Sequence, residues 1–392
     1  MKHAEPADGA TAVRWLRLRA QRLDDATRAL PARLRDVIHA VGGVQAQDEH
    51  AALLGLRARR LGVTAEDLAA ARRPASRREP ARGSGPSIVR TWCMRGTLHL
   101  VPADLLADLL AVFGPVHVAR GRRRLAQLGL DEVACARGVA VIAEVLASRG
   151  ALTRHALAEA VRDHGVPLDV TGQAPVHLIR RACLQGVACQ VGAPDGSPRY
   201  GLREHVAPAP LPERRSALGR IGRWYLDAFA PASPDDLAAW SGLPAADVRH
   251  AWRHAGDLVA VARTDPPLWR RADGDARADG DPLTVRLLPA FDGYLLGYRD
   301  RRHVLARDHA HLVNAGGGMV RPTLVVGGRV TGTWRIDRAR ARLLVTTFAG
   351  LAGVPLSGLD AEVDDVGRCL GLNLTVAVVG GPAHPGAHPT AS

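Results

Sequence analysis

The sequence predicts an α+β protein in which tandem winged helix-turn-helix motifs precede a strand-rich C-terminal domain. Helical segments followed by two β-rich segments recur along the chain, and a proline-rich joint (APAPLP, 207–212) separates two of these runs. Strand-forming residues then dominate from residue 283 onward. We expect a winged-helix-like unit with a β-hairpin at 1–130, winged helices at 131–206 and 207–282, a strand-rich domain at 283–379 and a disordered tail at 380–392.

The pattern is clearest in the middle of the chain. Residues 137–149 have helical periodicity that ends at Gly150, and Thr153 is a suitable N-cap for a second helix at 154–163. A third helix is expected at 175–185 before Gly186, and strands are expected at 187–191 and 199–202. Three helices followed by a two-stranded wing indicate a winged helix-turn-helix.

Further copies are expected on both sides. After the joint, a long helix at 213–229 precedes a second helix begun by Ser233-Pro234, a third at 243–254 and a wing within 258–271. At the N-terminus we expect helices at 30–40, 53–60 and 65–72, a mobile loop at 77–87 and a hairpin at 88–101. In the C-terminal domain, a hairpin at 319–334 turns at Gly327-Gly328, and a further strand follows at 343–348.

The charge of the chain points to a polyanionic partner. The formal net charge is +13, and Lys2 is the only lysine, so arginine carries nearly all of the positive charge. A GC-rich coding sequence also favours arginine, but here Asp and Glu do not balance it. The planar guanidinium pairs bidentately with phosphate, which favours DNA as the partner. With no internal lysine, a lyase that forms a Schiff base would have only Lys2 or the terminal amine as its nucleophile.

Other classes are excluded by what the sequence lacks. No stretch of about 18 apolar residues is present, and the N-terminus has no apolar signal-peptide core, so we expect a cytoplasmic, nucleoid-associated protein without membrane contact. The five cysteines are odd in number and form no CxxC pair, and no HExxH pattern occurs. We therefore expect no metal, no cofactor and a monomer.

Four local sequences carry the functional information: VQAQD at 44–48, RTWCMRGTLHL at 90–100, LPAFDGYLLGYRDR at 288–301, and NAGGGMVRPT at 314–323 continuing to GTWR at 332–335. Together they resemble the AlkZ/YcaQ-type winged-helix DNA glycosylases, with the motifs in the same order over residues 13–379. The long motifs are specific to that family. The short Gln-x-Gln gains meaning only beside them.

The resemblance implies a monofunctional glycosylase that hydrolyses the N-glycosidic bond of bulky N7-alkylated purines in double-stranded DNA. Some family members unhook interstrand crosslinks. The family's catalytic motif is Gln, an aliphatic residue, then Gln or Asp, and it corresponds here to Gln45, Ala46 and Gln47. The Gln–Gln form is typical of the branch linked to self-resistance against DNA-alkylating natural products, and alanine is a small centre for it.

The residue types suit that reaction. An N7-alkylguanine is already cationic, so it leaves without a general acid, and the enzyme must chiefly place a water at C1′ and stabilise an oxocarbenium-like sugar. Glutamine can orient a water but is a very poor base. Asp48 is a possible auxiliary base or source of negative potential. Because side chains two apart diverge on a helix, Gln45 and Gln47 require an extended backbone, for which Gly42-Gly43 supply the helix stop.

Candidate DNA contacts come from arginines and the hairpin. Those expected on the hairpin are Arg90, Arg95 and His99; those expected elsewhere are Arg122, Arg123, Arg124, Arg180 and Arg181. Phe291, Tyr294 and Tyr298 are expected to pack a core. Asp292, Arg299 and Asp300 are open to two interpretations, a structural ion-pair network or an active site. At the level of the whole protein, the alternative to a glycosylase is a non-catalytic winged-helix DNA-binding protein or regulator.

Overall fold

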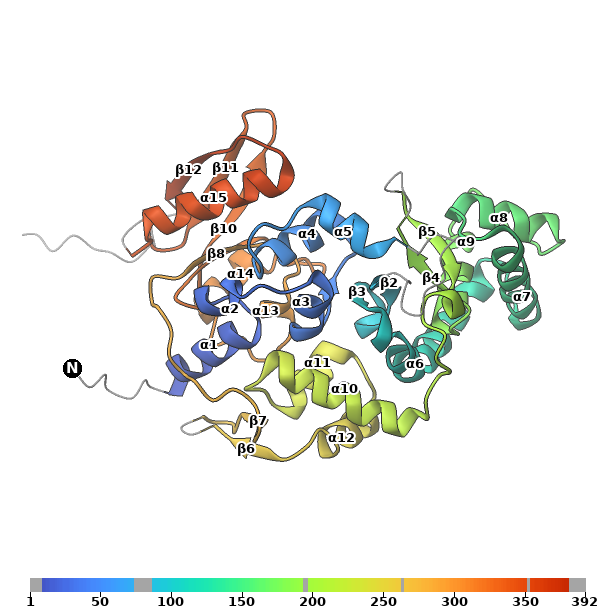
Figure 1. Cartoon of the computed structure of the whole chain (residues 1–392), viewed down its shortest axis with the longest axis horizontal. Helices are drawn as coiled ribbons and strands as arrows, with labels where there is room; N and C mark the ends of the chain where they lie inside the picture. The colour runs from blue at the N-terminus through green and yellow to red at the C-terminus, as the bar shows by residue number, and fades with distance from the viewer. Residues whose placement is uncertain (1–8, 74–86, 193–196, 262–263, 351–352, 381–392) are drawn as a thin grey trace, which may run out of the picture.

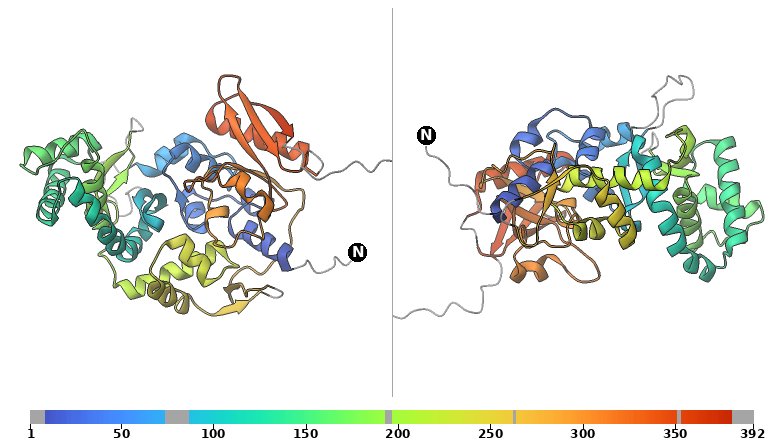
Figure 2. Two further views of the ribbon diagram at one scale, coloured as in Figure 1. Left: turned by 180° about the vertical axis from the view of Figure 1, so that it is seen from behind. Right: turned by 90° about the horizontal axis from the view of Figure 1, so that it is seen from below.

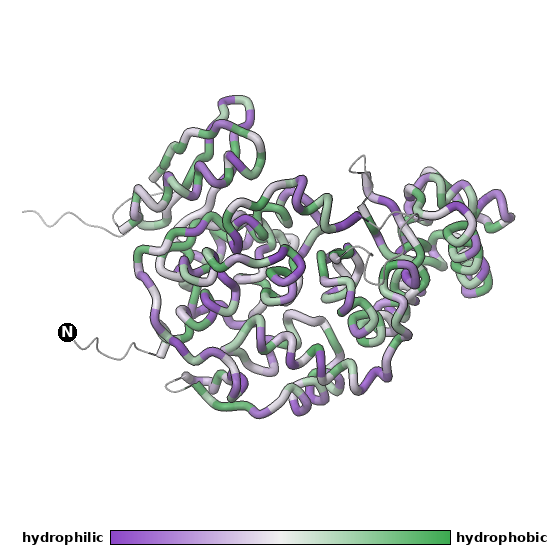
Figure 3. The backbone as a smooth tube through the Cα atoms, in the orientation of Figure 1, coloured by the Kyte–Doolittle hydropathy of each residue, from purple (hydrophilic) through white to green (hydrophobic). Residues whose placement is uncertain are grey.

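The computed structural model describes residues 9–73, 87–192, 197–261, 264–350 and 353–380. It is a mixed α/β protein with a strand-rich C-terminal region (Figure 1). The predicted mobile loop (77–87) and disordered tail (380–392) lie almost wholly outside the described residues. No helix in the described ranges is long and apolar enough to cross a membrane. Figure 3 accordingly shows hydrophilic and hydrophobic residues interspersed along the backbone.

The N-terminal region contributes five helices. Their bounds are α1 (Gly9–Ala20), α2 (Asp25–Ala29), α3 (Leu34–Ala40), α4 (Glu49–Arg57) and α5 (Ala65–Arg72). Asp24 and Asp48 cap α2 and α4, and Thr64 forms a capping box at the start of α5. The helix expected at 30–40 is shorter than predicted, and the one expected at 53–60 begins four residues earlier because Asp48 caps it there.

A five-stranded sheet joins the N-terminal region to the middle of the chain. Its order is β1 (Val44–Gln45), β3 (Leu98–Pro102), β2 (Ile88–Trp92), β4 (Ala188–Val191) and β5 (Arg199–Leu202). The N-terminal hairpin and the expected wing therefore share one sheet. The β2–β4 pairing has a single registered pair, Arg90 with Gln190, which lie 100 residues apart.

Four helices follow the first hairpin. They are α6 (Leu106–Gln127), α7 (Glu132–Arg149), α8 (Arg154–Asp163) and α9 (Ala174–Leu184). Three 3-10 turns lie nearby: η1 (Met94–Gly96) joins β2 to β3, η2 (Ala103–Leu105) precedes α6, and η3 (Arg203–His205) follows β5. Asp131 and Thr153 cap α7 and α8, and Gly150 ends α7 with a φ of 80°. The last three helices and the β4–β5 hairpin enclose one core that includes Ile142, Leu157 and Leu178.

A second run of helices follows the proline-rich joint. It comprises α10 (Arg214–Phe229), α11 (Pro234–Ser241) and α12 (Ala245–Arg253), followed by the two-stranded pair β6 (Leu258–Ala260) and β7 (Trp269–Arg271). Ser233 caps α11, and Gly242 ends it in the left-handed conformation. An aromatic cluster lies between α10 and α11, and the centroids of its contacting rings are between 5.1 and 5.9 Å apart. It consists of Trp224, Tyr225, Phe229 and Trp240.

The C-terminal region is a second five-stranded sheet with helices around it. The strand order is β12 (Thr375–Gly380), β11 (Arg342–Thr347), β10 (Arg329–Asp337), β9 (Thr323–Val326) and β8 (Val285–Leu288); the helical elements are α13 (Gly293–Leu296), η4 (Arg307–His309), α14 (Ala310–Val313) and α15 (Leu356–Leu370). The predicted hairpin turn at Gly327-Gly328 is confirmed. Helix α15 and the parallel strand β12 were not predicted.

Buried charges attach this region to the N-terminal helices. Glu362 of α15 is 2% exposed and binds Arg57 of α4 at 2.8 Å and Arg28 of α2 at 2.6 Å. These arginines, with Arg286, hold the pKa of Glu362 at about 2 against the opposing effect of its burial. The α7–α9 helices lie at the opposite end of the molecule from the C-terminal sheet (Figure 2), and α3 and α4, the helices that flank the Gln-x-Gln segment, lie between these two ends (Figure 1).

Candidate active site

The Gln-x-Gln segment is extended, as its chemistry requires. Gly42 and Gly43 have φ values of 76° and 79° and turn the chain out of α3. Gln45 then pairs with His99 across the β1–β3 ladder, and the Ala46 N–H donates to the Leu98 carbonyl at 2.8 Å. Ala46 is buried, whereas Gln45 is half-buried and Gln47 is exposed. The small central residue therefore faces the protein, and the flanking amides are left accessible.

Both glutamine amides end against the same turn of the β2–β3 hairpin. The Arg95 guanidinium donates to Oε1 of Gln45 at 2.8 Å, and the Leu98 N–H donates to Oε1 of Gln47 at 3.0 Å. These partners can only donate, so each amide must turn its oxygen toward them. No further partner for either amide is found among the described residues, so each oxygen keeps a second lone pair there and each NH2 keeps its donors. The pair can therefore orient a water or a sugar oxygen.

Arg95 is the charged group closest to this chemistry. It occupies η1 with a φ of 54°, and its other terminal nitrogen donates to the Trp240 carbonyl at 2.5 Å. Burial lowers the pKa of Arg95 to about 10, and the nearby charge of Arg301 adds to this effect. The group is still protonated at neutral pH, so a full positive charge bears on the Gln45 oxygen and reduces its basicity further.

The acidic groups beside the motif are already engaged. Asp48 caps α4 by accepting from the His50 and Ala51 N–H groups. Glu49 pairs with Arg90 and, at 3.5 Å, with Arg72. Neither carboxylate is an uncommitted base, although Asp48 is exposed and one of its oxygens accepts no hydrogen bond from the described residues. The auxiliary role expected for Asp48 is therefore in competition with its capping role.

Two hairpin residues expected to contact DNA lie inside the protein. Arg90 is 8% exposed, and its Nε donates to the Ala46 carbonyl at 2.8 Å. His99 is 3% exposed, its Nδ1 donates to the Thr97 carbonyl, and burial lowers its pKa to about 3. The reason is that helices pack against this sheet: α5 and α9 contact β2, which carries Arg90, and α3 contacts β3, which carries His99. Arg90 holds the motif in place, and His99 is neutral at physiological pH.

The other predicted arginines fall into three groups. Arg122, Arg123 and Arg124 are exposed on α6, although Arg122 lies 3.5 Å from Glu132. Arg181 is 7% exposed and is held by both oxygens of Glu132, so it does not face a DNA surface. Arg180 is half-buried and reaches the carbonyl of Gly96, which brings it to the same turn as Arg95.

The C-terminal motif forms the far wall of the site. The sequence left open whether Asp292 belongs to an active site or to a structural ion-pair network, and it did not predict this contact with Gln45. The loop 289–293 closes a cavity of about 10 Å³ beside Gln45, and this cavity is also lined by Gly43, Arg59, Phe291 and Asp292. That is about the space of one water. Arg59 and Asp292 form a buried two-bond ion pair at 2.7 and 2.8 Å that fixes the loop against α4. Tyr294 and Tyr298 are buried, as predicted.

Phe291 marks this arrangement both in the backbone and in the sequence. It is a half-buried aromatic residue with a φ of 57°, a conformation that bulky side chains rarely adopt and that is concentrated at functional sites. In the sequence, the signal is an aromatic residue followed by Asp-Gly directly after a strand.

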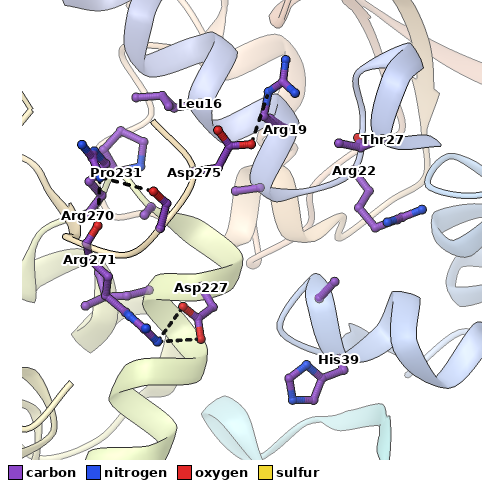
Figure 4. Close-up of a pocket in the computed structure, with 15 residues that line it drawn as sticks. Leu16, Arg19, Arg22, Thr27, His39, Asp227, Pro231, Arg270, Arg271 and Asp275 are labelled. Atoms are coloured by element: carbon purple, nitrogen blue, oxygen red, sulfur yellow. Dashed lines mark hydrogen bonds and ion pairs between the residues drawn. The ribbon is translucent and has the colours of Figure 1, made fainter. Parts of the chain in front are cut away.

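A larger cavity lies elsewhere and contains none of the motif residues. It has a volume of about 340 Å³ and lies between α1, α3, α10 and β7. Figure 4 shows two ion pairs in its lining, with Arg271 bound to Asp227 and Arg19 close to Asp275. Among the residues with described coordinates, no three His, Cys, Asp or Glu side chains are grouped as metal ligands would be.

Comparison with known proteins identifies the family. A model described as AlkZ-like DNA glycosylase matches residues 38–369. The chain is 27% identical over 372 aligned residues to the interstrand DNA cross-link repair glycosylase of Streptomyces sahachiroi, covering 88% of this chain and 93% of that protein. The solved structure of DNA glycosylase AlkZ from the same organism has a similar fold, with a TM-score of 0.76 and 24% identity over 96% of this chain and 100% of that one. The chain therefore belongs to the AlkZ-like family and is a DNA glycosylase, a hydrolase of N-glycosyl bonds.

Proposed function

We propose that this glycosylase releases bulky N7-alkylated purines from double-stranded DNA, with Gln45 and Gln47 positioning the attacking water. The observation that carries the proposal is the hydrogen bonding of the two glutamine amides, together with the cavity beside Gln45. Both lie against one turn, each oxygen is oriented by a partner that can only donate, and a cavity about the size of one water opens beside Gln45.

Most acid and base groups near the motif are engaged in the described part of the chain, and this limits the substrate. Asp48 caps a helix, Glu49 and Asp292 are paired with arginines, and His99 is buried and neutral. A site of this kind cannot activate water strongly or protonate a departing base. It suits a purine that already carries positive charge and departs as a neutral molecule. An unmodified purine or a neutral lesion is a poor substrate for it.

The winged-helix interpretation belongs to the same proposal. Two sets of three helices followed by two strands, α7–α9 with β4–β5 and α10–α12 with β6–β7, have the element order of winged helices. We take them as DNA-binding units of a monomer that associates with the nucleoid. The S. sahachiroi relative is described as a cross-link repair glycosylase, so interstrand crosslinks joined through N7 are included among the proposed substrates.

The test is base release from a duplex that contains a single N7-methylguanine. We expect the wild-type protein to liberate the free base and leave an alkali-labile abasic site. Gln45→Ala and Gln47→Ala should each lower the single-turnover rate by about 100-fold or more, the range found when a preorganised polar contact to the reacting centre is removed. Gln185→Ala, at an exposed position on the C-cap of α9, is the matched control and should keep the wild-type rate.

Each outcome bears on a different part of the proposal. Loss of release in both motif variants, with retained thermal stability, supports the assignment of the water-positioning pair. Full activity in both variants would overturn it. A wild-type protein that releases neutral hypoxanthine as fast as N7-methylguanine would overturn the substrate class.

A further inference from the structure

We propose that Arg120 and Arg180, beside the turn that carries Arg95, form a binding site for a DNA backbone phosphate that flanks the alkylated nucleotide. This inference rests on the proposed function. It adds the place at which the DNA backbone is held and the effect of the phosphate charge on the reaction. The three arginines come from separate elements, η1, α6 and α9.

Contacts around two glycines bring Arg120 and Arg180 to the turn that carries Arg95. Arg120 donates to the carbonyl of Gly242 at 3.0 Å, and a Cβ on Gly242 would lie 3.2 Å from the Cα of Arg95. Arg180 approaches Gly96, the residue after Arg95, so closely that a Cβ there would lie 2.8 Å from its terminal nitrogen. Both glycines therefore permit a close approach that a larger residue would block.

The positive charge gathered here is not neutralised by the protein. Within the described ranges, no carboxylate lies within 4.0 Å of Arg95, Arg120 or Arg180; the acceptors that they reach are main-chain carbonyls and the Gln45 amide. Other arginines nearby differ, since Arg181, Arg214 and Arg220 each bind a carboxylate. Partial burial lowers the pKa of both Arg95 and Arg180, as expected for cations that lack a counter-charge.

A buried histidine gives a second, independent observation. His117 of α6 is 2% exposed, and its ring packs beside Gly96, within 3.1 Å of the position of a Cβ on that glycine. Its Nε2 has no hydrogen-bond partner among the described residues, and neither does Nε of Arg180. Burial and the charges of Arg180 and Arg120 lower the pKa of His117 to about 4, so it is neutral at pH 7 and adds no further positive charge to the cluster. Unpartnered polar atoms within an uncompensated cationic cluster favour an anionic ligand.

The reaction itself requires this neutralisation. When an N7-alkylpurine leaves, the positive charge moves from the base to the sugar, because the C1′–N9 electron pair departs with the base. Arg95 is bound to Gln45, so its charge would oppose an oxocarbenium-like sugar at that place. A phosphate held by Arg120 and Arg180 beside the same turn weakens this repulsion. The cluster therefore binds the backbone and makes the site tolerate a cationic transition state.

The test uses duplexes in which one phosphate at a time, on either side of an N7-methylguanine, is replaced by an uncharged methylphosphonate. Dissociation constants and saturating single-turnover rates are measured for the wild type, Arg180→Gln, Arg120→Gln and Arg277→Gln. The last variant is the matched control because it makes the same change in net charge at an exposed arginine already paired with Asp275.

We expect one linkage, or two adjacent ones on one strand, at which the methylphosphonate weakens wild-type binding about tenfold or more, the effect of losing a charge-assisted hydrogen bond. The same substitution should cost Arg180→Gln and Arg120→Gln clearly less, while Arg277→Gln behaves as wild type. The salt dependence of binding should also fall by about one counter-ion for each of the two variants.

Two results would overturn the inference. One is a scan with no sensitive linkage. The other is an equal loss at the sensitive linkage in wild type and in both cluster variants, since independent effects add. Either result, obtained with base release intact, would leave the proposed function standing. Absence of base release from the unmodified duplex would instead remove the proposed function.

Discussion

Asp292 and Asp300 are two aspartates of one motif whose ion pairs differ in burial, and they give a matched pair for measurement. Asp292 binds Arg59 through two bonds at 2.7 and 2.8 Å, and both side chains are only 2% exposed. Asp300 binds Arg302 near the surface, where the side chains are 37% and 46% exposed. The perturbation is Asp292→Asn, with Asp300→Asn as its control.

The expected magnitudes follow from burial. Removing one partner of a buried pair leaves the other charge uncompensated and costs about 3–5 kcal/mol. Asparagine can still accept from the Tyr294 N–H and cap α13, so we expect the lower end of that range, about 3 kcal/mol. An exposed pair contributes at most about 1 kcal/mol. At roughly 1.2 °C per kcal/mol for a chain of this size, Asp292→Asn should lower the Tm by about 4 °C and Asp300→Asn by no more than about 1 °C.

The assay is thermal unfolding at pH 7 followed by circular dichroism, with base release measured well below the transition. Because the loop 289–293 borders Gln45, Asp292→Asn should also slow base release, whereas Asp300→Asn should not. Equal Tm shifts for the two variants would refute the assignment of Asp292 to a buried structural pair. A large loss of activity at Asp292 without any loss of stability would instead indicate a direct chemical role.

Two further predictions concern residues next to the motif. Arg95→Met should lower the saturating single-turnover rate about 10- to 100-fold, because it loses a charge-assisted hydrogen bond of about 1.5–3 kcal/mol. In a Gln45→Ala background the same change should lower the rate clearly less. Full additivity of the two changes would show that Arg95 does not act through Gln45. His99 has a folded-state pKa of about 3 against 6.5 when unfolded, so the unfolded chain binds more protons between these values and stability falls as the pH is lowered through that range. Acidification from pH 7 to pH 5 should therefore cost about 2 kcal/mol through His99, and this part of the loss should be absent in His99→Gln, as measured by urea unfolding at both pH values.

Elements that local signals define were predicted well. Thr153 and Gly150 are cap and stop residues whose effect is local, and the helix predicted at 154–163 matches α8. The hairpin at Gly327-Gly328 was found because both glycines adopt the positive φ that the turn needs. Helix α15 was missed because its Gly358 and Gly367 lower local helix propensity; in the fold they allow close contact with Val285 and with the Leu372 carbonyl.

The sequence predicted the motif of the site but not the contacts that distant segments make with it. Gln45 and Gln47 were identified by resemblance, and the extended backbone followed from the spacing of the two residues. The burial of Arg90 depends on strand β4, 100 residues away, and the wall formed by 289–293 is more than 240 residues from Gln45. Pairings over such separations leave no periodicity in the local sequence. From the sequence, Arg90 on the hairpin was therefore interpreted as a DNA contact. In the structure it is buried and binds the Ala46 carbonyl.

The central claim is that two glutamines position water for a leaving group that is already activated. Its most direct test compares single-turnover release of N7-methylguanine and of neutral hypoxanthine by the wild type and by a Gln45→Ala/Gln47→Ala double variant. The account predicts rapid release of N7-methylguanine only, lost in the double variant. Release of both bases at similar rates, or unchanged release of N7-methylguanine by the double variant, would contradict it.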